Sequence, residues 1–339
     1  MDRKALSRLE HYQAYETLGV YLAPDGSCDA QVEKLTNLAI QWSDAMQIGR
    51  ISREEAWLAI NTTIWSTLSY PLAALRLSKD QWEAIMAPIL RYGLPAMGIC
   101  RNFSRQLTFS DVSLFGLGFK HLFTMQEITR IKDVIQHTWE QTLTGKLYRT
   151  SFELFFIEIG IGPNLLDIPE NVLFLATDSL VTSTVHFLRE YQITLQHDIT
   201  LLPQRQHDLL IMEAFSQMHL SQSELFDCNC CRLYLKVLFL SDIVTGDGCE
   251  ISENAWSGIC DDSFRARSWP PWPYPSRAKW KVWQQSIRTA FCTRGRRLRQ
   301  PLGIWLLEDP DWPWFVAFDY SALYQRRNQQ WFIHSVVAL

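Results

Sequence analysis

The chain has 339 residues, of which 47% are hydrophobic and 20% charged, and its formal net charge is -4. This length and hydrophobic content support a folded core in two or three domains, and the composition excludes a wholly disordered chain. A slightly acidic protein binds nucleic acid only where a local basic patch overcomes its overall charge.

Cysteine usage and the lack of long apolar runs indicate an intracellular protein, nuclear or cytoplasmic. Eight cysteines are scattered along the chain, which favours reduced thiols over a disulfide framework. No apolar run reaches the roughly 20 residues that a membrane-spanning helix needs. The polar start of the chain does not resemble a signal peptide, and we expect no membrane partner.

The first half of the chain is predicted to be helical after one short strand. Residues 17–23 read as that strand, and Pro24, Asp25 and Gly26 form a turn signal. Apolar periodicity then predicts helices over residues 29–48 and 146–159, and helices that begin near Ser52, Ser78 and Thr124. The helix that begins near Thr124 should bury Ile128, Ile131, Ile135 and Trp139.

Local signals set the ends of several of these helices. Ser52 with Glu55, and Ser78 with Gln81, have the Ser-x-x-Glu/Gln spacing of a capping box. Proline lacks an amide proton, so Pro71 should stop the second helix and Pro88 should end or kink the third. Residues 94–109 read as irregular, with a possible strand at 106–109. The two glycines of 116–118 indicate a tight turn rather than a phosphate loop.

The second half of the chain begins after a predicted domain boundary at residues 160–164. Helices are expected over residues 177–191, 206–218 and 229–244, and the last should be buried because residues 233–240 are apolar nearly all round. Proline-rich residues 269–275 predict an extended entry to a C-terminal module. That module should contain a helix over residues 276–289 and a small antiparallel sheet built from three apolar runs, 303–307, 314–318 and 331–336.

A metal site is disfavoured. Cys228, Cys230 and Cys231 form the densest thiol cluster, but a zinc site usually pairs two Cys-x2-4-Cys units, and no second pair exists. On a helix these three positions do not share one face. Buried free thiols are the favoured interpretation.

Catalytic signatures are also missing, so we expect no enzyme activity and no cofactor. Asp261 and Asp262 form the one adjacent Asp pair. A polymerase needs such a pair on a tight hairpin beside another aspartate in order to hold two metal ions. The flanking residues lack strand patterning, so a solvated loop is favoured. No Gly-x-Ser-x-Gly motif is present.

The segment of residues 276–300, here called the basic segment, carries the strongest functional signal. It holds eight cations and no acidic residue. The candidate nucleic-acid-binding residues are Arg277, Lys279, Lys281, Arg288, Arg294, Arg296, Arg297 and Arg299. Cations neutralise phosphates, and the interleaved Trp280, Trp283 and Phe291 could stack on bases. Alternatively, the tryptophans are core residues and the arginines form a solvated face or contact acidic segments of the same chain.

Several strings in order resemble one group of reverse transcriptases of eukaryotic non-LTR-type retroelements, as in diatom and algal reverse-transcriptase-like reading frames. Those in the first half are AINTTI at 59–64, LSYPLAAL at 68–75, IMAPIL at 85–90, GLP at 93–95, GICRNF at 98–103 and GLG at 116–118. Those in the second half are NCCRLYL at 229–235, LSDI at 240–243, WP at 269–270, W-x-x-W at 280–283 and PLGIW at 301–305. The resemblance covers most of residues 17–335.

The resemblance implies the helical thumb and connection regions that follow a polymerase palm. It divides the chain into a palm-exit strand and turn (1–26), a helical thumb-like domain (27–160), a helical connection region (161–260) and a Trp/Arg-rich C-terminal α+β module (261–339). The palm's aspartate motif is absent from this sequence. The implied fold is mainly α with minor β, and the implied partners are RNA or DNA and a palm supplied in trans. Arg50, Arg53 and Lys79 are weaker thumb-side candidates for phosphate contact. A protein-interaction module or an inert retroelement remnant is the alternative.

Overall fold

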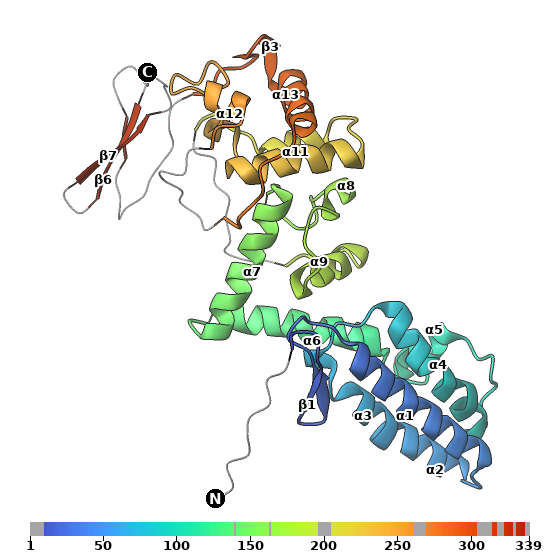
Figure 1. Cartoon of the computed structure of the whole chain (residues 1–339). Helices are drawn as coiled ribbons and strands as arrows, with labels where there is room; N and C mark the ends of the chain where they lie inside the picture. Colours follow the sequence, from blue (N-terminus) through green and yellow to red (C-terminus); the bar gives the residue numbers. More distant parts are fainter. Residues whose placement is uncertain are drawn as a thin grey trace, which may run out of the picture. The chain divides into compact units, whose positions relative to one another are not determined.

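The computed structural model describes residues 10–138, 140–162, 164–195, 205–260 and 269–303, and the backbone of three strands between residues 314 and 335. The fold is mainly α with minor β, as the sequence predicts. The chain divides into two compact units, Met1–Glu140 and Gln141–Leu339, whose elements are labelled in Figure 1. Each unit is described by itself.

Unit 1 is a helical layer preceded by a small hairpin. Helix α1 packs along α4, and α6 packs on both α3 and α4. In chain order the elements are β1 Tyr15–Thr17, β2 Val20–Leu22, α1 Asp29–Ile48, α2 Arg53–Leu58, the π-helix η1 Ala59–Ile64, α3 Trp65–Ser69, the 3-10 helix η2 Leu72–Ala74, α4 Lys79–Ala96, α5 Arg105–Phe109, the 3-10 helix η3 Val112–Leu114 and α6 Leu122–Thr138.

The two capping boxes and the bounds of the first helix are confirmed in unit 1. Both predicted capping boxes form, with the Ser52 and Ser78 hydroxyls accepting from the third backbone amide of α2 and α4. Helix α1 has the predicted bounds, and its carbonyl at Ala45 accepts from the amide of Gly49. Side-chain capping depends only on neighbouring residues, so such ends can be identified without knowledge of the tertiary fold.

Several predictions for unit 1 are wrong. Residues 17–23 are not one strand, because Leu18 and Gly19 both have positive φ and turn the chain between β1 and β2. Residues 106–109 belong to helix α5 rather than a strand. Pro88 does not end the third helix, because α4 continues through Pro88 and Pro95 to Ala96. Its packing on α1 and α6 holds it in place, which offsets the cost of an interior proline.

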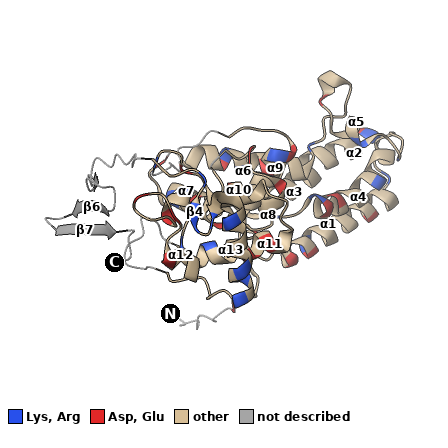
Figure 2. Ribbon diagram, turned by 90° about the horizontal axis from the view of Figure 1, so that it is seen from above, with Lys and Arg blue, Asp and Glu red and all other residues tan. Residues whose placement is uncertain are grey.

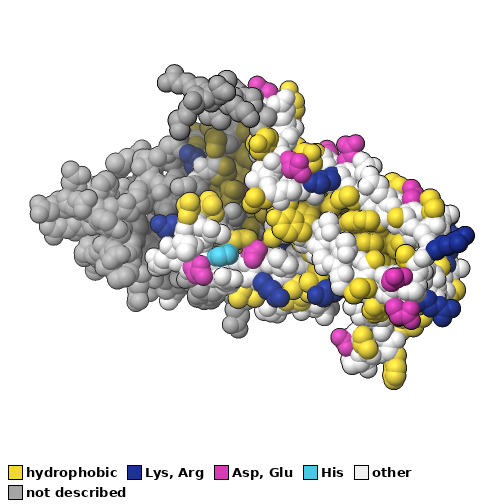
Figure 3. All heavy atoms as spheres, turned by 90° about the horizontal axis from the view of Figure 1, so that it is seen from below, with side chains coloured by type: hydrophobic (Ala, Val, Ile, Leu, Met, Phe, Trp, Pro, Cys, Tyr) yellow, Lys and Arg dark blue, Asp and Glu magenta, His cyan; other side chains and the backbone are white. Residues whose placement is uncertain are grey.

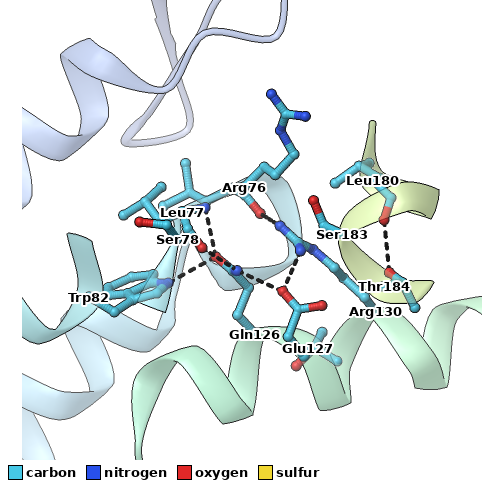
Figure 4. A network of polar contacts seen from close by, with 12 residues as sticks. Arg76, Leu77, Ser78, Trp82, Gln126, Glu127, Arg130, Leu180, Ser183 and Thr184 are labelled. Carbon is cyan, nitrogen blue, oxygen red and sulfur yellow. Dashed lines mark hydrogen bonds and ion pairs between the residues drawn. The ribbon is translucent and has the colours of Figure 1, made fainter. Parts of the chain in front are cut away.

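Helix α6 buries polar residues in place of two of the three predicted isoleucines, while Ile131 is half-buried and Trp139 lies outside the described residues. Ile128 and Ile135 are exposed, whereas Gln126, Glu127 and Arg130 are buried. The reason is a hydrogen-bond network with the chain that leads into α4 (Figure 4). Buried polar groups are tolerated where their hydrogen bonds are satisfied, so apolar periodicity alone identified the wrong face.

Gln126 lies at the centre of this network. Its side-chain oxygen accepts from the Trp82 indole at 2.9 Å and from the Leu77 amide at 3.2 Å. Its nitrogen donates to the Leu77 carbonyl at 2.9 Å and to Glu127 at 3.0 Å. Arg130 pairs with Glu127 and donates to the Leu75 carbonyl. Thus α6 is fixed against the α3–α4 connection by polar contacts within a buried interface.

Unit 2 is arranged around helix α11, which contacts α7, α8, α10 and α13. Its helices and its first two strands are α7 Leu143–Ile159, α8 Glu170–Leu173, α9 Leu180–Glu190, α10 Ile211–Ser216, α11 Gln222–Leu235, the 3-10 helix η4 Leu240–Asp242, α12 Glu253–Ser257, α13 Arg277–Phe291, β3 Cys292–Arg294 and β4 Arg297–Leu298. The remaining strands are β5 Trp314–Val316, β6 Ala322–Arg327 and β7 Gln330–Ser335.

A buried arginine fixes α11 against the end of α7. Arg232 of α11 is 0% exposed and donates to the carbonyls of Ile157 and Glu158 at the C-terminal end of α7. It also donates to Asn229 at 2.8 Å and to the Val237 carbonyl at 3.2 Å. Burial lowers the pKa of Arg232 to about 9, so the guanidinium is charged at neutral pH. A cation there also complements the partial negative charge of the helix C-terminus.

The predicted boundary at residues 160–164 lies inside unit 2, because the chain divides after Glu140. Gly160 has φ 68° and ends α7 in the left-handed conformation. A side chain at this position would collide with Arg232. The glycine therefore marks the close approach of two packed helices rather than a linker.

The rest of unit 2 agrees with the sequence in part. The helix expected over 229–244 instead runs from Gln222 to Leu235, where Lys236 takes a left-handed conformation, although the apolar run that follows is buried as expected. The predicted C-terminal sheet is antiparallel, in the order β5-β6-β7. Strand β6 was not predicted, and the apolar run 303–307 lies largely outside the described residues.

Replacing Gln126 should destabilise unit 1. Gln126→Met keeps the approximate volume but leaves the Trp82 indole and the Leu77 amide and carbonyl without their partner. We expect a loss of roughly 3 kcal/mol, measured as reduced amide hydrogen-exchange protection in α4 and α6. Gln136→Met, on an exposed position of the same helix, is the control, and equal effects of the two variants would contradict the network's role.

Replacing Arg232 should destabilise unit 2 in the same way. Arg232→Met leaves the last carbonyls of α7 unsatisfied inside the protein, and we expect a loss of roughly 2–4 kcal/mol. Urea titration, followed by hydrogen exchange in α7 and α11, measures it. The exposed Arg277→Met is the matched control. Unchanged protection in Arg232→Met would show that the contact contributes little.

Candidate nucleic-acid interface

Helix α13 separates the basic segment into a buried face and a solvent face. Ser276 caps the helix by accepting from the Lys279 amide at 3.5 Å. Trp280, Trp283 and Ile287 are buried, as their spacing predicts. The buried face packs on α11 and α10, and the basic residues of α13 lie outside that face; Figure 2 marks Lys and Arg in blue.

The hairpin of β3 and β4 carries the other basic residues. Gly295 has φ 62° and makes the tight turn between the strands. Arg294 and Arg297 are direct cross-strand partners. The hairpin is held in place because the Arg296 carbonyl accepts from the Ile251 amide at 2.9 Å, and the Leu298 amide donates to the Cys249 carbonyl at 2.9 Å. The position of these arginines is therefore set by ordered backbone.

Four of the eight candidate cations have partners within unit 2. Lys279 forms an ion pair with Asp227 at 3.2 Å, and Arg296 forms one with Glu253. The Arg288 guanidinium lies 5.3 Å from the centre of the Trp256 ring. Arg299 donates to the carbonyls of Cys292 and Thr289. The alternative in which arginines contact acidic segments of the same chain thus accounts for part of the segment.

The other four cations extend into solvent. Arg277, Lys281, Arg294 and Arg297 are exposed, and no ion pair is found for them among the residues that the structure describes. One acidic residue lies nearby, since Glu250 pairs its backbone with Arg297. These four, here called the free cations, are the part of the predicted site that can meet a ligand.

The aromatic part of the predicted site is unavailable. Trp280, Trp283 and Phe291 are 7%, 0% and 6% exposed. The Trp283 indole donates to the Ala255 carbonyl at 3.3 Å inside the unit. Rings in the core cannot stack on bases, so the hypothesis of aromatic stacking by these three residues is wrong. The alternative, that the tryptophans are core residues, is confirmed.

The thiol cluster is buried on α11, as the sequence predicts. Cys228, Cys230 and Cys231 are each 5% exposed or less. Burial raises the pKa of Cys228 to about 12, and it also raises the pKa of Cys231. In the described part of the chain, no group of three or more His, Cys, Asp or Glu side chains is placed to hold a metal ion.

Other sequence candidates are less informative. Arg50, Arg53 and Lys79 are exposed in unit 1. Asp261 and Asp262 lie outside the described residues. The extended segment 269–275 packs in part against unit 2, because the Tyr274 ring lies edge-on to the Tyr234 ring with 5.1 Å between the ring centres.

A cavity of about 240 Å³ lies beside α13 and was not predicted from the sequence. Its walls include Met218, Leu220 and Val282, and Glu224 and Lys281 bring one negative and one positive charge to it. Ser286 also lines it and accepts from the Cys228 thiol at 3.4 Å. The residues come from α13 and from the turn into α11, so no local sequence motif could have indicated it.

The comparisons with known proteins add no assignment: no protein-family model, curated protein sequence or solved structure matches this chain. Within the described residues, no helix combines the length and apolar character needed to cross a membrane. Exposed hydrophobic side chains are mixed with charged ones on the face drawn in Figure 3. The basic segment and the cavity are therefore the features from which function can be argued.

The thiols give a direct test of the arrangement on α11. In the folded chain, iodoacetamide at pH 8 should alkylate exposed Cys100 much faster than Cys228 and Cys231, because thiolate is the reactive form and burial suppresses it. Peptide mass spectrometry over a time course measures this. After unfolding in guanidinium the rates should converge. Fast labelling of Cys231 before unfolding would contradict the burial.

Proposed function

We propose that this chain is a non-catalytic nucleic-acid-binding protein, corresponding to the thumb and connection regions of a retroelement reverse transcriptase. The basic segment contacts phosphates without reading sequence. The retroelement assignment rests on the ordered sequence strings, and the binding surface rests on the free cations of α13 and the β3–β4 hairpin.

The observation that carries the binding proposal is the cross-strand pair Arg294 and Arg297. Like charges placed directly opposite each other on a hairpin destabilise it. Both side chains are exposed, and Arg296 between them is already paired with Glu253. A phosphate bound between the two arginines would relieve their repulsion, and Arg277 and Lys281, near the other end of α13, add exposed positive charge to the same segment.

The nature of the exposed groups indicates which part of a nucleic acid is recognised. Contacts to phosphates position a nucleic acid but carry no sequence information directly. The rings of the basic segment are in the core, so charge is what this surface offers. Binding should therefore be sequence-independent and strongly dependent on salt.

Replacing the four free cations should weaken both affinity and its salt dependence. The variant Arg277→Gln, Lys281→Gln, Arg294→Gln, Arg297→Gln is titrated against a fluorescein-labelled RNA–DNA hybrid, with anisotropy measured between about 50 and 200 mM salt. For each replaced cation that contacts a phosphate, the negative slope of log K against log salt should become shallower by about one. The wild-type chain should bind with a clear negative slope.

The control removes the same charge from unit 1. Arg101, Arg105, Lys120 and Lys132 are exposed there, and changing them to Gln alters the net charge equally. An equal loss of binding in both variants would mean that only net charge matters. Absence of salt-sensitive binding by the folded wild-type chain would reject the proposal.

The cavity beside α13 favours a second candidate function, protein docking, with a peptide of a partner protein as the occupant. Small-molecule sites usually measure about 300–1,000 Å³, so a cavity of about 240 Å³ is better matched to one apolar side chain. Glu224 and Lys281 place opposite charges beside it. The complementary peptide has an apolar anchor residue flanked by one basic and one acidic residue.

Selection from a random displayed-peptide library against the full chain tests this second function. Enriched peptides should share the apolar anchor with flanking opposite charges, and binding should fall at least about tenfold in Val282→Trp, which fills the cavity. Glu224→Gln removes the charge while keeping a capping box, as Ser78 and Gln81 show, and should weaken binding less. Peptides that bind Val282→Trp equally well would reject the cavity as the site.

A further inference from the structure

One lysine and one cysteine of unit 2 lie close enough to react with each other. The Lys279 nitrogen on α13 is 3.2 Å from the Cys230 sulfur on α11, although 49 residues separate them in sequence. The same nitrogen is 3.2 Å from a carboxylate oxygen of Asp227. The Phe226 ring, 4.5 Å away, covers another side of the ammonium. Three contacts thus hold the nitrogen beside the sulfur.

The position of this pair distinguishes Cys230 from its two neighbours. Cys228 and Cys231 are 0% exposed, and Cys230 is 5% exposed. The Lys279 side chain is 28% exposed, so the pair lies at the edge of the α11–α13 interface rather than at its centre. A small oxidant such as hydrogen peroxide can approach Cys230 along this edge, where the sulfur is the nucleophile that attacks the peroxide oxygen.

We propose that Cys230 and Lys279 are a site of oxidative cross-linking. Peroxide first converts the thiol to a sulfenic acid, with release of water: R–SH + H2O2 → R–SOH + H2O. The neutral Lys279 amine, its extra proton released to solvent, then attacks the electrophilic sulfur and displaces water: R–SOH + R′–NH2 → R–S–NH–R′ + H2O. Sulfenic acids are known to condense with thiols and with nitrogen in this manner.

The electron balance of the link closes with peroxide alone. Sulfur loses two electrons, which reduce one peroxide to two waters over the two steps. A second peroxide can insert oxygen, R–S–NH–R′ + H2O2 → R–S–O–NH–R′ + H2O, with two further electrons taken from the S–N unit. Either product joins the same two residues.

The link would lock α13 to α11 and remove one positive charge from the basic segment. Lys279 is paired with Asp227 and is not one of the four free cations, so the link leaves those four side chains unchanged. Oxidation would therefore change the stability of the α11–α13 interface more than it changes phosphate contact. The inference does not depend on nucleic-acid binding and holds whether or not that function is confirmed.

Mass spectrometry of the full-length protein tests the proposal. The reduced chain is treated with hydrogen peroxide, remaining thiols are alkylated, and the protein is digested with a protease that does not require lysine. A peptide joining Cys230 to Lys279 should be found, about 2 Da lighter than its parts for the S–N link or about 14 Da heavier for the S–O–N link. Dithiothreitol should reverse it.

Matched variants make the assignment specific. Lys279→Arg keeps the charge beside Asp227, and Cys230→Ser keeps a small polar side chain; both should lose the linked peptide. Cys231→Ser should keep it. Exposed Cys100 reports within the same sample that the oxidant has acted.

Three results would overturn the inference. One is oxidation of Cys100 with Cys230 still alkylatable and no linked peptide. Another is Cys230 converted to sulfinic or sulfonic acid without any link to Lys279. A linked peptide that persists in Lys279→Arg would place the partner amine elsewhere and would also reject it.

Discussion

The insertion of a charged arginine into a position surrounded by backbone carbonyls holds unit 2 together. Arg232 leaves α11 and meets the last carbonyls of α7, and Arg205 does the same between distant loops, donating to Gly303 at 2.9 Å and to Gly246 at 3.1 Å. A buried charge is costly unless it is well hydrogen-bonded. The backbone must therefore stay in one arrangement around each guanidinium, and α11 is fixed as the centre of the unit.

The properties of the basic segment follow from that fixed centre. Because α11 is held in place, α13 can bury Trp280 and Trp283 against it, and the remaining positions of α13 are directed outward. The eight basic residues then divide into those that stabilise the unit and those that extend into solvent. The first group attaches α13 and the hairpin to their surroundings, and the second presents charge on a surface whose geometry is already set.

What the sequence could predict depends on the range of the interactions involved. The helix starts at Ser52 and Ser78 could be predicted because a capping box spans only four residues. The start of α11 carries the same signal at Ser221 and Glu224, but the helix was placed later in the chain, over the apolar residues 233–240. The buried face of α6 could not be predicted, because Gln126 finds its partners 44 and 49 residues away. The partners of Lys279 and Arg296 are equally distant, so a count of basic residues could not separate bound from free cations.

The two units differ in the chemistry that satisfies their buried arginines. In unit 1, Arg130 is paired with the carboxylate of Glu127. In unit 2, Arg232 and Arg205 donate to backbone carbonyls. Carboxylates take up protons in acid, whereas amide carbonyls do not at any pH a protein meets. The carbonyl partners of Arg232 are therefore unaffected by acid, and its attachment to the end of α7 does not depend on the ionisation of any acidic side chain.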